Sequence, residues 1–85
     1  MLIKWDEPKR IANIDKHGFD FAAITDDFFE QALIIPAKQG RHMALGRLND
    51  GTVAVVFVMM GNEALSIISM RPASKTERRL YDDQR

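Results

Sequence analysis

Hydrophobic residues recur at helical spacing in the first third of the chain, after a short apolar start. Residues 2–5 predict a short strand, and a helix is expected over 7–17 because Gly18 is placed to end it in the left-handed conformation. The spacing of apolar residues after Asp20 predicts a second helix over 20–30, with Asp20 as a possible N-cap.

The remaining two thirds of the chain show apolar runs and tight turns that are typical of strands. Residues 33–35, directly before Pro36, predict an edge strand, because proline cannot donate a hydrogen bond to a neighbouring strand. Three further strands are expected over 41–48, 52–60 and 64–70, joined by the turns Asn49-Asp50-Gly51 and Gly61-Asn62-Glu63. The second of them is almost entirely apolar, which indicates a central strand covered on both faces.

A last helix is expected to begin after Ser74 and to extend to about Gln84, because Ser74 and Glu77 have the spacing of a capping box. The predicted fold class is therefore α+β, with two N-terminal helices, an antiparallel meander sheet of three or four strands and a C-terminal helix. Because a chain of 85 residues has room for one core, residues 1–85 are expected to form a single domain.

Composition narrows the possible functions. The chain has 12 basic and 12 acidic residues, so any affinity for nucleic acid has to come from the arrangement of the basic groups. The lack of cysteine excludes disulfides, thiolate catalysis and zinc knuckles. The longest apolar run, residues 53–60, is too short to span a membrane, which favours a cytoplasmic location. The chain lacks the sequence motifs of nucleotide-binding loops, esterases and zinc proteases, which argues against these classes of protein. Asp26 and Glu30 could face the same side of a helix, but without a third ligand nearby they would make an incomplete magnesium site.

One face of the first predicted helix is polar and basic. Lys9, Asn13, Lys16 and His17 are offset by spacings that place them along the same side of a helix. This face is either simply solvated or a surface that meets phosphate groups. An imidazole changes its charge near neutral pH, so His17 is also a candidate for proton transfer.

Two arginines stand at strand ends. Arg41 begins one predicted strand and Arg71 ends another, so in a meander they can lie at the same edge of the sheet, where two guanidinium groups would form an anion site. The alternative is that both are solvated strand ends. His42 is expected to point to the opposite face from Arg41.

The last predicted helix carries Arg78 and Tyr81 but few apolar residues. It should therefore be stable only when it packs against the rest of the domain.

Several short motifs, taken in order, resemble the BrnT family of bacterial toxins. They are Trp5-Asp6, then Lys9, Asn13 and Lys16-His17-Gly18, then Phe28-Phe29 and Leu45-Gly46-Arg47, and finally Ile67-Ile68-Ser69 with Arg71, Ala73, Glu77-Arg78 and Tyr81. The resemblance runs nearly from end to end. The resemblance implies a RelE-like ribonuclease toxin of a type II toxin-antitoxin module. Such a toxin cuts RNA and inhibits translation, and it contacts DNA only through an antitoxin with a ribbon-helix-helix domain.

The chemistry of metal-free RNA cleavage suggests roles for these residues. The 2′-hydroxyl attacks the adjacent phosphate, which requires a base, an acid and cations for the charge on the phosphorane, but no cofactor and no metal. With Glu77 in support from the last helix, we predict catalytic roles for His17, Arg41, Arg71 and Tyr81 and RNA-binding roles for Lys9, Lys16 and Arg78.

The chain also departs from the family pattern. The family often has Glu-Arg where this chain has Gly40-Arg41, an arginine in place of Ser66 and another near Met60. The resemblance therefore leaves two alternatives open. The protein is an active ribonuclease, or it is a weak or inactive toxin-fold module that binds an antitoxin and takes part in operon repression.

Overall fold

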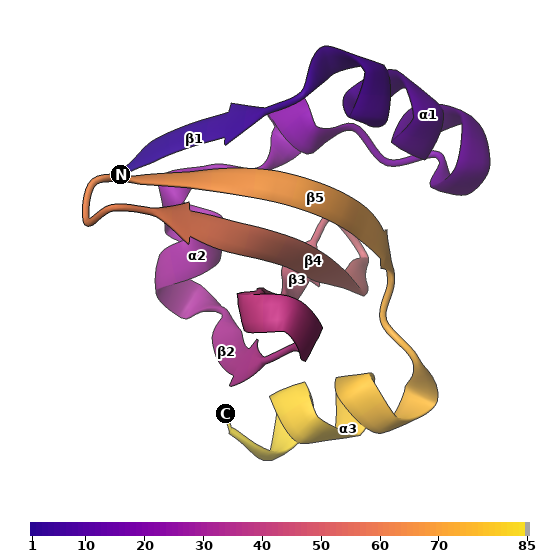
Figure 1. Ribbon diagram of the computed structural model, residues 1–85. Helices are drawn as coiled ribbons and strands as arrows, with labels where there is room; N and C mark the ends of the chain where they lie inside the picture. The colour runs from indigo at the N-terminus through magenta and orange to yellow at the C-terminus, as the bar shows by residue number, and fades with distance from the viewer. Residues whose placement is uncertain (85) are drawn as a thin grey trace.

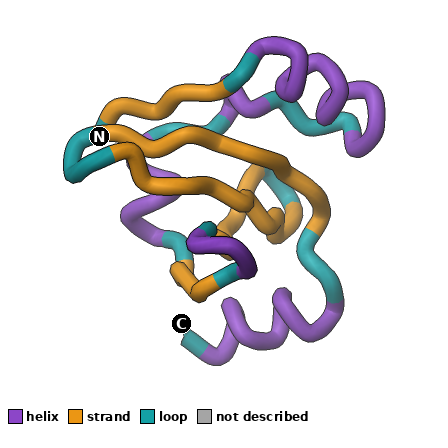
Figure 2. The backbone as a smooth tube through the Cα atoms, in the orientation of Figure 1, coloured by secondary structure: helices purple, strands orange, loops and turns teal. Residues whose placement is uncertain are grey.

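The computed structural model describes residues 1–84, and its centre is a five-stranded sheet with the strand order β1-β5-β4-β3-β2 (Figure 1). The strands are short to medium in length and are joined mostly by short loops (Figure 2). The elements are β1 (Leu2–Trp5), α1 (Glu7–His17), the 3-10 turn η1 (Phe21–Ala23), α2 (Asp26–Gln31), β2 (Leu33–Pro36), the 3-10 turn η2 (Lys38–Gly40), β3 (His42–Leu48), β4 (Gly51–Met60), β5 (Ala64–Pro72) and α3 (Lys75–Asp83).

The predicted α+β class and the meander are confirmed, but the prediction of an antiparallel sheet of three or four strands is wrong, because the sheet has five strands and one parallel pair. β3, β4 and β5 pair antiparallel in sequence, and β2 forms the edge beside β3 as expected. β1 lies at the other edge and runs parallel to β5, with Leu2 opposite Ala64 and Trp5 opposite Ile67. A parallel partner that lies about 60 residues away leaves no turn signal, so the local pattern could not identify it.

The prediction of one continuous helix over 20–30 is also wrong. The Asp20 side chain accepts a hydrogen bond from the Ala22 N–H and caps η1, and the chain is then extended through Ile24 and Thr25. The Thr25 hydroxyl accepts from the Phe28 N–H at 3.4 Å, so a second cap starts α2. Two local caps therefore divide the segment in which the spacing of apolar residues predicted one helix.

The other helix ends agree with the sequence. Gly18 ends α1 at φ 75°, a left-handed conformation that glycine adopts without a steric penalty. Asp6 is at the N-cap position of α1 but makes no side-chain capping bond within residues 1–84. Ser74 and Glu77 form the predicted capping box of α3. No helix in residues 1–84 is long and apolar enough to cross a membrane.

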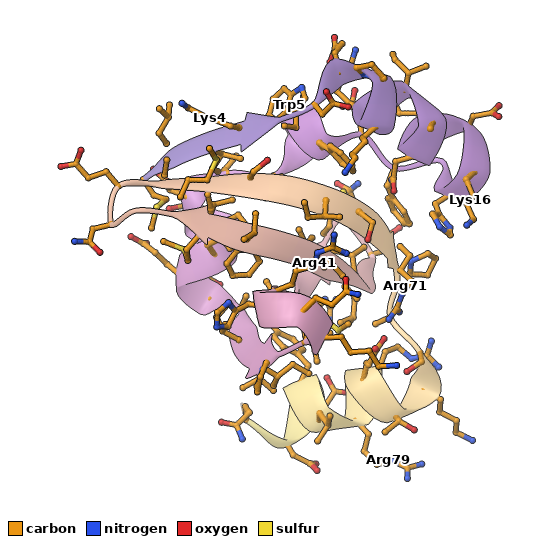
Figure 3. The ribbon with its side chains drawn as sticks, in the orientation of Figure 1. Lys4, Trp5, Lys16, Arg41, Arg71 and Arg79 are labelled. Carbon is orange, nitrogen blue, oxygen red and sulfur yellow. The ribbon has the colours of Figure 1, made fainter. Side chains whose placement is uncertain are left out.

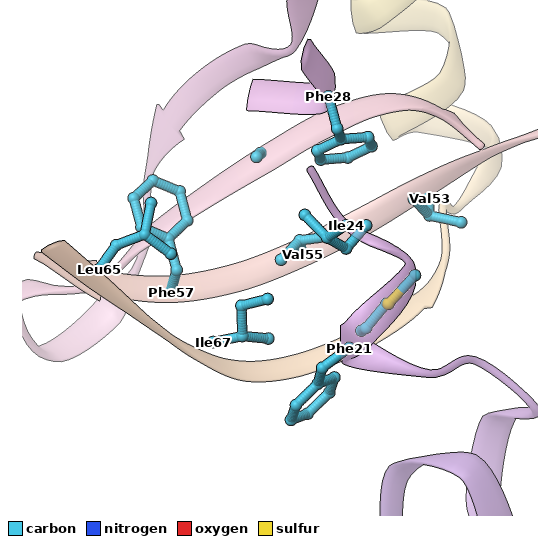
Figure 4. Close-up of a cluster of buried hydrophobic side chains, with 10 residues drawn as sticks. Phe21, Ile24, Phe28, Val53, Val55, Phe57, Leu65 and Ile67 are labelled. Carbon is cyan, nitrogen blue, oxygen red and sulfur yellow. The ribbon is translucent and has the colours of Figure 1, made fainter. Parts of the chain in front are cut away.

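The two faces of the sheet carry cores of different size. As the alternation predicts, Val53, Val55 and Phe57 point to one face and Ala54 to the other. The larger core lies against η1 and α2 (Figure 4) and contains Phe21, Ile24, Phe28, Ala44, Val53, Val55, Phe57, Leu65, Ile67 and Met70. The smaller core contains Leu45, Ala54 and Tyr81, beneath α3.

The packing of α2 on β3 depends on a glycine. A Cβ atom at Gly46 would lie 2.8 Å from the ring of the buried Phe28, closer than real Cβ atoms approach any side chain. We expect Gly46→Ala to lower the free energy of unfolding by about 1–3 kcal/mol, because the ring has to move within a close-packed core. Urea unfolding measures the change.

Gly51→Ala is the matched control, because a Cβ atom there meets nothing within 4 Å. It should alter the free energy of unfolding by less than about 0.5 kcal/mol. Equal effects of the two substitutions would contradict the close contact between Gly46 and Phe28.

Candidate functional site

A buried asparagine holds α1 against the sheet. Asn13 is only 6% exposed; its amide donates to the Phe19 carbonyl at 3.0 Å, and its Oδ1 accepts from the Met70 N–H at 3.0 Å. β1 pairs with β5 only as far as Ile67, so at Met70 the edge of β5 meets the Asn13 side chain in place of a strand. Asn13 therefore belongs to the interior rather than to a solvated helix face.

The residues around Asn13 line an open pocket of about 350 Å³ between α1 and β5. Lys9, Lys16 and His17 approach it from α1, as the sequence predicted, and Arg41 enters from the segment between η2 and β3. In Figure 3, Arg41 lies in front of the sheet and Lys16 at the free end of α1. The tertiary structure thus joins the basic helix face to an arginine that is about 30 residues away in the chain.

A bulge in β5 forms the floor of this basic pocket. Val56 of β4 pairs with Ser69, but the next residue, Phe57, pairs with Ile67, so Ile68 is an extra residue in β5. Ile68 and Ser69 both line the pocket, and the extra residue allows two neighbours to face the same side. Sequence analysis missed both as site residues, because nothing in the local pattern marks the bulge.

Arg71 is placed differently from Arg41. Among the described residues it is not one of those that line the basic pocket, so a shared anion site of the two arginines stays a prediction. Its guanidinium instead forms a two-point ion pair with Glu77, at 2.7 Å and 2.9 Å. The Arg71 guanidinium lowers the pKa of Glu77 to about 2, with a further contribution from the Ser74 N–H. The pair ties α3 to the end of β5.

The remaining predicted site residues lie on α3. Tyr81 is 7% exposed and packs with Leu45 and Ala54, which favours a role in the smaller core over proton transfer. Arg78 is exposed, and one of its guanidinium nitrogens donates to the Ala73 carbonyl at 3.4 Å. Neither residue is among those that line the basic pocket in residues 1–84.

The charge of the basic pocket determines what it can bind. Lys9, Lys16 and Arg41 place three cations around one opening, with an imidazole and the Ser69 hydroxyl beside them. Such a set of cations can bind successive phosphate groups. Within residues 1–84 no group of three His, Asp or Glu side chains is placed to hold a metal ion.

The fold and the basic pocket define a small α+β protein with several cations around one opening. Residues 5–77 match the family described as the ribonuclease toxin BrnT of type II toxin-antitoxin systems. The chain therefore belongs to the BrnT family of ribonuclease toxins, as the sequence motifs predicted.

A solved structure supports the assignment. The chain is 53% identical to the ribonuclease toxin BrnT of Brucella abortus, whose crystal structure was determined at 1.1 Å resolution. The match has a TM-score of 0.83 and covers 88% of this chain and 99% of the other. A comparison with curated protein sequences gives no match.

The buried asparagine leads to a stability prediction. Asn13→Ala would leave the Met70 N–H and the Phe19 carbonyl without their partners, and we expect a loss of about 1–3 kcal/mol in the free energy of unfolding. Asn13→Asp keeps an acceptor for Met70 but loses the donor to Phe19. Urea unfolding compares both variants with Asn62→Ala, in an exposed turn, which should be nearly neutral.

The Arg71–Glu77 pair leads to a pH prediction. The pKa of Glu77 is lowered from 4.5, its value in the unfolded chain, to about 2 in the folded protein. The pair therefore stabilises the fold fully above pH 4.5, and this contribution is lost as the pH falls through about 2. At pH 7 we expect Glu77→Gln to lower the free energy of unfolding by about 1–2 kcal/mol. Water screens part of the attraction, because the Arg71 side chain is 34% exposed.

Urea unfolding of the wild type and Glu77→Gln between pH 7 and pH 2 tests this expectation. The difference in the free energy of unfolding should shrink toward pH 2. Glu63→Gln, in an exposed turn, is the control and should change little. A difference between wild type and Glu77→Gln that is independent of pH would contradict the charge pair.

Proposed function

We propose that this protein is an endoribonuclease that cleaves RNA without a metal ion or cofactor, and that the basic pocket is its active site. The observation that carries the proposal is the meeting of Lys9, Lys16, His17 and Arg41 around one opening. Membership in a family of ribonuclease toxins supports RNA as the substrate. We propose that it acts in the cytoplasm to inhibit translation and that a cognate antitoxin, with a ribbon-helix-helix domain, neutralises it.

In the proposed mechanism the 2′-hydroxyl of the RNA attacks the neighbouring phosphorus atom. Arg41 lies where its guanidinium can bind the phosphate oxygens and stabilise the extra negative charge of the phosphorane. His17 takes the proton of the attacking 2′-hydroxyl and delivers it to the departing 5′-oxygen, and Lys9 and Lys16 bind the flanking phosphates. The 5′-oxygen leaves, and the RNA retains a 2′,3′-cyclic phosphate.

Arg71 and Tyr81 have supporting roles in this proposal. The ion pair of Arg71 with Glu77 and the packing of Tyr81 on Leu45 hold α3 in place. Arg78 remains exposed on α3, where it can attract RNA electrostatically. The relationship to RelE-like ribonucleases stays a prediction from the sequence.

A second function, binding of an antitoxin without catalysis, has support from two positions. Ser66 is uncharged and Met60 is apolar and 50% exposed, where the family resemblance implies arginines. Fewer cations near the RNA would lower the rate of cleavage without preventing the binding of a protein partner.

Cleavage assays with the purified toxin, free of antitoxin, test the proposed function. Single-stranded RNA should be cut in the presence of EDTA and end in a cyclic phosphate, while DNA should survive because it lacks the attacking hydroxyl. Arg41→Ala should lower the rate by about 10²-fold, and His17→Ala should lower it as well if the imidazole transfers the proton.

Arg79→Ala is the control, because Arg79 is exposed on α3, away from the basic pocket (Figure 3). It should retain nearly the wild-type rate. Loss of cleavage in EDTA would contradict the metal-free mechanism. No cleavage by the wild type, together with tight binding of the antitoxin, would favour the second function.

A further inference from the structure

A second pocket lies at the end of the larger core and contains almost no polar surface. It has a volume of about 270 Å³ and is lined by side chains from the N-terminus and the middle of the chain: Met1, Phe29, Ile34, His42, Phe57 and Met59 among them. In the described part of the chain it shares no residue with the basic pocket. His42 stacks on Phe57 of the larger core, so it faces away from Arg41, as the alternation of the strand predicted.

Exposed apolar residues surround this apolar pocket. Ile34 is 43% exposed on the edge strand β2 and Met59 is 38% exposed near the end of β4, and both line the pocket. Met1, which also lines the pocket, is 57% exposed, so the mouth of the pocket carries exposed apolar residues from three separate parts of the chain. Exposed apolar residues grouped around a pocket are typical of a binding surface for another protein.

An unpaired polar atom points to an occupant. The Nδ1 atom of His42 is buried and has no hydrogen-bond partner among residues 1–84. A buried polar atom without a hydrogen-bond partner is energetically unfavourable, so a bound group that supplies a hydrogen bond there is favoured. The occupant therefore combines an apolar body with a polar group that reaches His42.

The rim of the apolar pocket is acidic. Asp26 and Glu30 of α2 line an adjoining hollow together with Met1 and Phe29, two residues that also line the apolar pocket. The amino group of Met1 lies 3.7 Å from Asp26 and offsets part of the charge. Carboxylates at this rim repel the phosphates of RNA and favour a partner with basic residues.

We propose that the apolar pocket and its acidic rim bind the antitoxin, through a segment in which an aliphatic or aromatic side chain is flanked by lysine or arginine. The apolar side chain fills the pocket, a polar group of the segment bonds to His42, and the basic residues pair with Glu30 and Asp26. The inference rests on the proposed function for the identity of the partner. It places this contact on the opposite side of the sheet from the basic pocket.

Calorimetric titration of the toxin with its purified antitoxin tests the inference. Ile34→Asp should raise the Kd by at least about tenfold, because it places a charge in the pocket. Ile11→Asp is the matched control: Ile11 is 53% exposed on α1, and its substitution should leave the Kd unchanged. Met59→Gln replaces another residue of the pocket with a polar side chain of similar size, so it should also raise the Kd. This variant replaces Ile34→Asp in the test if Ile34→Asp folds poorly.

A charge reversal tests the rim separately. Glu30→Lys should raise the Kd by about threefold to tenfold at low salt, and the effect should diminish as salt is added. Asp50→Lys, in the exposed turn between β3 and β4, makes the same change in net charge and should have little effect. The ¹⁵N signal of the His42 Nδ1 atom should shift when the antitoxin binds.

The outcomes separate this inference from the proposed ribonuclease activity. Weaker antitoxin binding by Ile34→Asp and Glu30→Lys supports the inference even if the wild type cleaves no RNA. Unchanged affinity of Ile34→Asp, Met59→Gln and Glu30→Lys overturns it, even if cleavage is confirmed. It is also overturned if Ile34→Asp weakens RNA binding while antitoxin binding is retained, because the pocket would then hold a nucleobase.

Discussion

The two hydrogen bonds of the Asn13 side chain hold together the part of the structure on which the basic pocket depends. β1 stops pairing with β5 at Ile67, and from there α1 covers the edge of the sheet. A neutral carboxamide can accept from Met70 and donate to Phe19 at the same time, which neither a charged nor an apolar side chain can do. Because these bonds orient α1, they also decide which of its side chains meet Arg41.

The sheet separates two surfaces of opposite character. On one side of the sheet, the basic pocket is surrounded by Lys9, Lys16 and Arg41. On the other side, at the end of the larger core, the apolar pocket has an acidic rim that includes Glu30. The net charge of zero conceals this division, since cations and carboxylates are concentrated in different places. In the proposals above, RNA binds to the first surface and a protein partner to the second, so one small domain would serve both without competition for the same side chains.

Local signals predicted most of the secondary structure, and their failures have physical causes. The left-handed Gly18, the turn before Gly51 and the capping box of Ser74 depend only on neighbouring residues, and all three are present in the structure. The helix predicted over 20–30 failed because the caps at Asp20 and Thr25 compete with helix propagation. The sequence placed Asn13 on a face that was either solvated or in contact with phosphate groups, whereas the structure buries it in hydrogen bonds to two distant backbone groups.

What the sequence determined by itself was the set of short-range elements, the basic face of α1 and the family. Helix periodicity, turn chemistry and ordered motifs act within a few residues, and they can be recognised without the fold. Only the tertiary structure decided that Arg41 joins Lys16 and His17, that Arg71 pairs with Glu77 and that Tyr81 is buried. The meeting of Arg41 with α1 involves the edge of β5 beyond β1 and the bulge at Ile68, and the burial of Tyr81 depends on its packing against Leu45 and Ala54. These contacts arise from long-range packing that no local pattern encodes.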